Sequence, residues 1–144
     1  MESPPLVPGT KVTCAKTVSE SDVYLFAGIT GDFAPNHVDE VFMRKSAFGR
    51  RIAHGALIVG YMSRASSLII AQAPASPEGY TPVSLGYDKI RFLKPVFIGD
   101  TVTITYVVER TDLAKHRTYA KVEATNERGE LVAVADHVMQ WVKA

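Results

Sequence analysis

The chain has 144 residues, of which 47% are hydrophobic and 22% are charged, and its net charge is +1. This composition is ordinary for one globular domain, and the balanced charge gives no argument for binding nucleic acid or a membrane surface. Cys14 is the single cysteine, which excludes an internal disulfide. The first residues lack the pattern of a secretory leader, and no apolar run reaches about 18 residues, so we expect a cytoplasmic protein.

The first part of the chain predicts a short lead-in followed by a strand. Residues 1–9 contain three prolines and a glycine, which favour an extended segment before a domain over residues 10–144. Polar and apolar residues alternate over residues 10–18, as in a strand with one buried face. Cys14 shares the apolar face, so we interpret it as a small core residue.

Two helices are predicted next. Ser19 and Asp22 have the spacing of a capping box, and an apolar stripe continues from them to Gly31. This pattern predicts a helix that ends at the glycine. Asp39 then precedes a second short apolar stretch, so we expect it to cap a short helix that includes residues 41–42.

The segment between these helices carries a carboxylate and an imidazole. Asp32 and His37 are five residues apart, so on a regular helix they would point about 140° away from each other. Pro35 disfavours helical dihedrals at Ala34, which predicts a turn in which both side chains face one small molecule. A histidine beside a carboxylate suits general acid–base chemistry on water. The alternative is that both side chains serve only the turn.

Residues 55–72 predict the most apolar helix of the chain, one that other elements surround. At its start, the N–H of Gly55 would be an unpaired donor at the positive end of the helix dipole, suited to a developing oxyanion. We interpret His54 as structural. A stripe of small residues would either leave a narrow channel or allow close packing on a sheet; it consists of Ala56, Gly60, Ser63 and Ser67.

The second half of the chain predicts a sheet. Residues 73–82 are rich in proline and predict a loop. Four strands with short connections should then be antiparallel neighbours; they are predicted over residues 83–93, 101–111, 117–127 and 130–142. Together with the first strand they would form an α+β domain, with an antiparallel sheet curled around the apolar helix. His137 is expected to pack or hydrogen-bond within the last strand.

Two stretches of the chain resemble the MaoC-like family of (R)-specific enoyl-CoA hydratases. The first resembles the family's hydratase motif and reads Asp32-x4-His37-x-Asp39, followed by Ile52-Ala53-His54-Gly55-Ala56. The second resembles a strand and the turn after it, and reads Arg91-Phe92-Leu93-Lys94-Pro95-Val96 and Gly99-Asp100-Thr101-Val102. The resemblance covers most of residues 20–142. The family usually has Asn-Pro where this chain has Ala34-Pro35, a difference that removes one amide from the loop.

The resemblance implies a hot-dog fold and reversible hydration of a trans-2-enoyl-CoA to an (R)-3-hydroxyacyl-CoA, with no metal or redox cofactor. It implies that Asp32 and His37 hold the attacking water, with Asp32 withdrawing a proton and His37 returning one to the α-carbon. The N–H of Gly55 would polarise the thioester carbonyl, and Asn36 and Ser63 would support the site. A homodimer is implied as well, because the family pairs its sheets edge to edge.

An acyl-CoA substrate would need cationic partners for its phosphates. The candidates are Arg50, Arg51, Arg91 and Lys94, although basic residues near a helix often form only a solvated face. Two other functions stay open on the same fold. An acyl-CoA thioesterase would release free thiol, and a non-catalytic acyl-CoA-binding module would bind the thioester without turnover.

Overall fold

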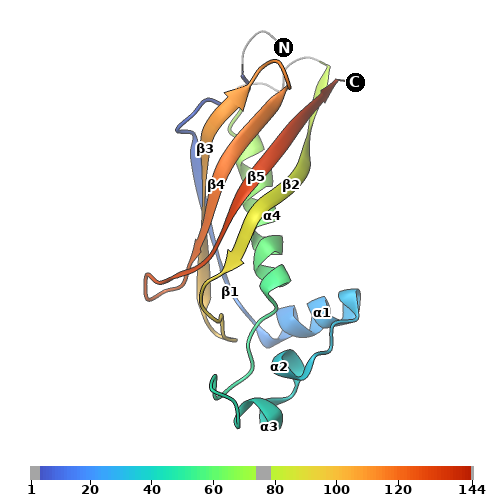
Figure 1. Cartoon of the computed structure of the whole chain (residues 1–144), viewed down its shortest axis with the longest axis vertical. Coiled ribbons are helices and arrows are strands. Elements are labelled where there is room, and N and C mark those ends of the chain that lie inside the picture. Colours follow the sequence, from blue (N-terminus) through green and yellow to red (C-terminus); the bar gives the residue numbers. More distant parts are fainter. Residues whose placement is uncertain (1–3, 74–78, 144) are drawn as a thin grey trace.

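The structure, a computed structural model, describes residues 4–73 and 79–143. Within these residues, a sheet of five antiparallel strands lies against one long helix, and three further helices gather at one end of the sheet (Figure 1). The elements in chain order are β1 Lys11–Thr17, α1 Glu20–Thr30, α2 Pro35–Val38, α3 Glu40–Met43, α4 Gly55–Ile70, β2 Tyr80–Phe92, β3 Thr101–Asp112, β4 Arg117–Thr125 and β5 Leu131–Lys143. The predicted α+β fold is confirmed, while most of the predicted loop, residues 74–78, lies outside the described residues.

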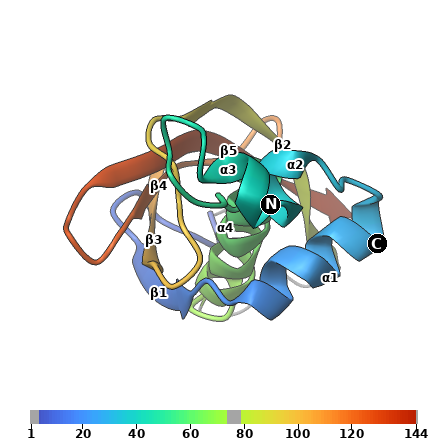
Figure 2. The same cartoon turned by 90° about the horizontal axis from the view of Figure 1, so that it is seen from below.

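The strands are arranged in the order β1-β3-β4-β5-β2, and each neighbouring pair is antiparallel. α4 runs along one face of this sheet (Figure 1). Seen along the long axis of the molecule, α1, α2 and α3 lie around the N-terminal end of α4 (Figure 2). No helix in the described part of the chain is both long and apolar enough to cross a membrane.

The core lies between α4 and the sheet. Alternate residues of β3 and β4 are buried, so one face of each strand is turned toward the helix. α4 contributes an apolar stripe at helical spacing, which consists of Ile58, Met62, Ala65 and Ile69. Burying a large apolar side chain stabilises a fold by about 1.5–3 kcal/mol. This contact therefore fixes the position of α4 and, with it, of Gly55 at its first turn.

The capping predictions are confirmed. The Ser19 side chain accepts a hydrogen bond from the Asp22 N–H, and the Asp22 side chain accepts one from the Ser19 N–H. α1 ends at Gly31, whose positive φ of 79° suits glycine and lets its N–H bond the Ala27 carbonyl at 2.8 Å. The Asp39 carboxylate caps α3 by accepting from the Phe42 N–H at 2.8 Å.

Two predictions about proline need correction. The turn predicted around Pro35 contains a single helical turn, α2, because proline is well suited to the first position of a helix, where its missing N–H has no partner to lose. β2 begins at Tyr80, so Pro82 lies in a strand instead of the predicted loop. β2 is an edge strand that pairs only with β5, and a proline is tolerated where one side of the strand needs no ladder bond.

The sheet packs on a central α4 as predicted, but one face of the helix stays exposed. The sheet covers one face of the helix, and the small-residue stripe of Ala56, Gly60, Ser63 and Ser67 lies on the exposed face. Close packing of this stripe on the sheet is therefore excluded. The larger residues of α4 take the sheet-facing positions, because they have more apolar area to bury.

His137 lies fully buried in the core, as expected of a residue that packs within the last strand. Its Nδ1 is 2.7 Å from the Tyr106 hydroxyl, and its Nε2 is 2.8 Å from the Ser84 hydroxyl. The Tyr87 ring packs against it, with centroids 4.4 Å apart. Burial disfavours the charged imidazolium and lowers the pKa of His137 to about 4.

We predict that His137 makes the fold less stable in mild acid. In the unfolded chain, His137 binds a proton below its ordinary pKa of 6.5. In the folded chain, it stays neutral down to about pH 4. The free energy of unfolding should therefore fall by about 2 kcal/mol between pH 7 and pH 5 through this residue alone. Urea unfolding at both pH values would measure it, with His137→Gln as the comparison. Equal pH dependence in the two proteins would contradict the prediction.

Candidate active site

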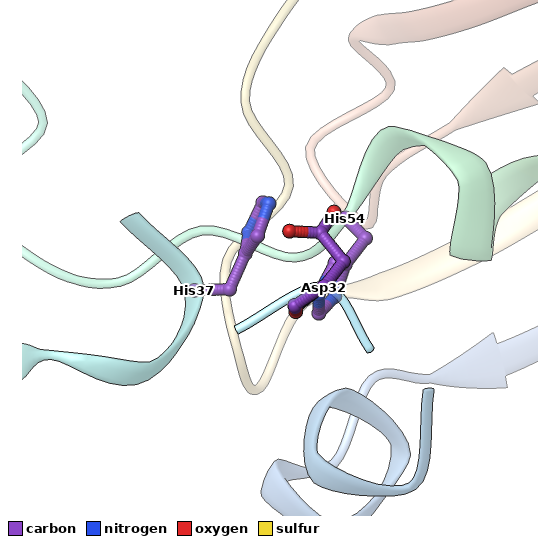
Figure 3. A group of neighbouring side chains, drawn as sticks. All are labelled: Asp32, His37 and His54. Carbon is purple, nitrogen blue, oxygen red and sulfur yellow. Dashed lines mark hydrogen bonds between the residues drawn. The ribbon is translucent and has the colours of Figure 1, made fainter. Parts of the chain in front are cut away.

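Three side chains from three segments converge below the start of α4. Asp32 follows α1, His37 lies in α2, and His54 directly precedes α4 (Figure 3). One carboxylate oxygen and one nitrogen of each ring lie within 4.8 Å of one another. Asp32 is exposed, whereas His37 and His54 are 8% and 2% exposed. The arrangement is thus a pair of buried imidazoles with a carboxylate at their solvent side.

The local backbone explains how Asp32 and His37 meet. Gly31 ends α1 in a left-handed conformation and redirects the chain. The Asp32 carboxylate accepts from the Ala34 N–H at 3.3 Å, which tightens the loop before Pro35 starts α2. Because Asp32 stands before this helical turn and His37 within it, the separation that a continuous helix would impose does not apply.

The orientation of His37 is set by a backbone carbonyl. Its Nδ1 lies 2.8 Å from the carbonyl oxygen of Ile52. Since a carbonyl can only accept, Nδ1 carries the proton and Nε2 of the neutral ring has a free lone pair. The Asn36 carbonyl also accepts from the Ile52 N–H at 3.0 Å. Two hydrogen bonds therefore hold α2 against the segment that leads into α4.

His54 belongs to the same group, although sequence reasoning gave it only a structural role. Its Nε2 lies 2.9 Å from the Asp32 backbone carbonyl, which again places the proton on the bonded nitrogen. Its ring stacks on His37, with centroids 3.7 Å apart and planes inclined by 26°. The position of His54 beside Gly55 was the available signal, but nothing in the sequence indicated that the ring faces His37.

An aspartate and two histidines are also common ligands of divalent metal ions. The lone pairs of an imidazole lie in the ring plane, and the two planes here are nearly parallel. Lone pairs in such planes cannot both be directed at one ion about 2.1 Å from each nitrogen. The geometry suits hydrogen bonds to a small molecule better than coordination of a metal.

Gly55 is the first residue of α4, and no side chain caps this helix. Its N–H is therefore one of the donors that a helix start leaves without an intrahelical partner. The Phe92 ring packs directly on the glycine, because a Cβ added to Gly55 would lie 2.6 Å from the Phe92 Cε2. The Phe92 ring thus leaves no room for a side chain at position 55.

A cavity of about 470 Å³ opens beside these residues. His37 and Gly55 line it together with mostly apolar side chains, among them Phe48, Ile58, Phe92, Val96 and Ala133. Asn36 and Lys94 add polar groups to the lining. Asp32 and Ser63 are outside the lining, so the cavity meets the catalytic candidates at His37 and Gly55.

Ser63 lies two turns along α4 from Gly55, on the exposed face of the helix. Its carbonyl accepts from the Ser66 hydroxyl at 2.7 Å. The buried Tyr87 hydroxyl has no hydrogen-bond partner within the described residues. Burial raises the pKa of Tyr87, and the nearby hydroxyls of Ser66 and Ser63 oppose this effect. Ser63 therefore lies near Tyr87 and Ser66 and does not line the cavity.

Arg51 is engaged by the protein itself. Its guanidinium bonds Glu20 at 2.6 Å and Glu40 at 2.9 Å, and its side chain is 14% exposed. These hydrogen bonds raise the pKa of Arg51, and the bond from Arg51 lowers the pKa of Glu40. A further bond to the Tyr24 hydroxyl, at 3.0 Å, completes its contacts. Arg51 thus ties α1 and α3 to the segment before α4.

The other cationic candidates are more accessible. The Arg50 guanidinium lies 4.0 Å from the centre of the Phe97 ring, and Arg91 bonds the Ile90 carbonyl at 2.7 Å. Lys94 pairs with Glu130 and lines the cavity. Arg50, Arg91 and Lys94 therefore keep solvent-facing charge, whereas Arg51 does not.

A curled antiparallel sheet on one central helix, with an aspartate and histidines at the helix start, defines the molecule as a hot-dog domain. The sequence pattern of the "MaoC like domain" matches residues 5–130. The chain belongs to this MaoC-like family.

Relatives and solved structures agree with this assignment. The chain is 42% identical over 100 residues to an (R)-specific enoyl-CoA hydratase of Rhodospirillum rubrum, a match that covers 69% of this chain and 64% of that protein. It is 35% identical to a 3-hydroxybutyryl-CoA dehydratase of Methylorubrum extorquens, over 83% of this chain and 69% of that protein. The solved structure of the (R)-hydratase from A. caviae superposes with a TM-score of 0.80 at 30% identity, covering 94% of this chain and 96% of that one.

We predict that Gly55→Ala destabilises the protein through Phe92. The new methyl group would press on the ring, and overpacking typically costs about 1–3 kcal/mol. The lower value is expected, because Phe92 is 55% exposed and can move aside. Urea unfolding would measure the loss, and adding Phe92→Ala should remove it.

Gly60→Ala is the matched control within the same helix. A Cβ at Gly60 meets nothing within 4 Å, so this change should stabilise α4 by up to about 1 kcal/mol. If both alanine variants changed the free energy of unfolding equally, contact with Phe92 would not be the constraint at Gly55.

Proposed function

We propose that the protein catalyses the reversible hydration of a trans-2-enoyl-CoA to an (R)-3-hydroxyacyl-CoA. The observation that carries this proposal is the convergence of the Asp32 carboxylate and the His37 imidazole beside the helix start at Gly55. The cavity next to them has room for a small acyl group. The relatives described above, an enoyl-CoA hydratase and a hydroxybutyryl-CoA dehydratase, support the same reaction.

In the proposed hydration, the water oxygen bonds to the β-carbon while the π electrons move toward the thioester oxygen. The N–H of Gly55 binds the oxyanion that develops there. His37 returns a proton to the α-carbon as the enolate collapses, so that the elements of one water are added. Asp32 holds the water by accepting its second O–H. In the reverse direction the same groups remove water.

The hydrogen bond from His37 to Ile52 supports a change in the proton assignments made from sequence. Its Nε2 has a lone pair and no proton, so the neutral ring is ready to accept a proton from water. The imidazolium formed in this way then holds the proton that the α-carbon needs. His37 thus acts as base and then as acid, while Asp32 orients the water.

We predict that His37→Gln lowers kcat by about 10²–10⁴, the usual contribution of a proton-transferring side chain. Asp32→Asn should lower kcat by about 10², as for a misplaced reactant. The assay is the loss of enoyl absorbance when the protein meets crotonyl-CoA, run beside a thiol-detecting reagent. Asp39→Asn makes the same chemical change two residues from His37 and should keep activity, because asparagine also caps a helix well.

Each outcome of this assay separates the candidate functions. Loss of absorbance without free thiol, abolished in Asp32→Asn, supports the hydratase. Release of free thiol identifies a thioesterase. Binding of the CoA ester without turnover by the wild type or either variant identifies a non-catalytic module, and the hydratase proposal is then rejected.

We propose that Arg50, Arg91 and Lys94 meet the phosphates of coenzyme A. Their exposure supports this role, and the two carboxylates on Arg51 argue against including it. Replacing any of the three with alanine should raise KM for crotonyl-CoA by up to about fivefold, since an exposed ion pair is worth about 0.2–1 kcal/mol. KM for crotonyl-pantetheine, which lacks the nucleotide, should not change.

Lys121→Ala is the control for these variants. Lys121 is exposed on β4 and alternates with residues that face α4, so it lies on the outer side of the sheet. It should leave KM for both thioesters unchanged. An equal rise in KM for crotonyl-pantetheine in the test variants would show that the cations act on the site and not on the phosphates.

We also propose that the protein forms a homodimer. β2 is an edge strand with exposed apolar residues, including Val83 at 42% and Leu85 at 52% exposed. The small-residue stripe of α4 is exposed as well. A second copy that pairs along this edge would satisfy the unpaired backbone of the strand and cover apolar surface.

A further inference from the structure

His54 has a buried nitrogen without a partner. Its Nδ1 makes no hydrogen bond within residues 4–73 and 79–143, and the residue is 2% exposed. Since Nε2 donates to the Asp32 carbonyl, Nδ1 of the neutral ring has a lone pair and acts as an acceptor. A buried acceptor without a donor is unfavourable, so the other contacts of the ring must hold it in this orientation.

The neighbours of His54 in the site are also acceptors. Nε2 of His37 has a free lone pair because Nδ1 donates to Ile52, and the Asp32 carboxylate accepts hydrogen bonds. Asp32 and His37 lie next to His54 in one group (Figure 3). Water has two O–H donors, which match the His37 nitrogen and the Asp32 carboxylate and leave none for Nδ1 of His54.

His54 also fixes the other two groups in place. Its Nε2–H bonds the backbone of Asp32, and its ring stacks on His37 at 3.7 Å. Phe26 packs against the same imidazole, with centroids 4.8 Å apart. These contacts restrict the motion of the His54 ring. The ring in turn restricts the motion of Asp32 and His37.

We propose that His54 is a positioning residue of the hydration reaction. It holds the loop of Asp32 through its Nε2–H and the ring plane of His37 by stacking, so that both groups can bind the same water. This inference rests on the proposed function. It adds a third side chain to the site, one that holds the two water-binding groups and does not exchange a proton with the substrate.

Two variants of His54 separate its two nitrogens. Glutamine places an amide N–H near the position of Nε2 and can keep the bond to Asp32, but it offers no acceptor at Nδ1. Asparagine places a carbonyl near Nδ1 and loses the bond to Asp32. We expect His54→Asn to lower kcat by about tenfold to a hundredfold with KM nearly unchanged, as for a misplaced reactant, because the loop of Asp32 is no longer held. His54→Gln should recover part of kcat when the melting temperature is preserved.

The His54→Asn substitution in the Asp32→Asn background tests whether His54 acts through Asp32. We expect it to cost less than about threefold there, because the water is already poorly held. His116→Asn, at the turn between β3 and β4, is the matched control and should keep the wild-type kcat. A wild-type kcat in His54→Asn, or the same fold loss in both backgrounds, would overturn the proposal.

A spectroscopic measurement tests the inference without turnover. Long-range 1H–15N correlation of the imidazoles at pH 8 reports which nitrogen of each ring carries the proton. We expect Nε2–H for His54 and Nδ1–H for His37. A proton on Nδ1 of His54 would overturn the proposal even in an active enzyme, whereas the expected tautomers in an enzyme without hydratase activity would reject the proposed function alone.

Discussion

Burial of one face of α4 against the curled sheet is the contact on which the rest of the molecule depends. It places the first turn of the helix at the end of the sheet where α1, α2 and α3 gather (Figure 2). Gly55 then meets the Phe92 ring from β2, and His54 points into the space below the helix. A hydrophobic contact with no chemical role thus positions every group that the proposed reaction uses.

Backbone carbonyls then determine which nitrogens of the site are free. Ile52 takes the Nδ1–H of His37, and Asp32 takes the Nε2–H of His54. Each bond selects one tautomer and leaves the other nitrogen of the ring with a lone pair. The same carboxylate residue therefore has two roles, since its main chain orients one histidine while its side chain faces the proposed water.

The basic residues around the site differ in their partners and in their exposure. Arg51 forms ion pairs with Glu20 and Glu40, and these pairs hold α1 and α3 against the segment before α4. Arg50 packs on the Phe97 ring and Lys94 lines the cavity, and both side chains remain exposed. Arg50 and Arg51 are adjacent in the sequence, but their partners come from different parts of the fold, so only Arg51 is held in ion pairs with carboxylates of α1 and α3.

The sequence by itself determined the features that depend on near neighbours. The capping box at Ser19, the stop at Gly31 and the cap at Asp39 each involve groups within four residues, and the family motif named Asp32 and His37. Only the tertiary structure brought His54 into the site, engaged Arg51 and left the small-residue stripe of α4 exposed. The decisive bonds join residues 15 and 22 positions apart. Such pairs depend on how distant segments pack together, and no local pattern of side chains encodes them.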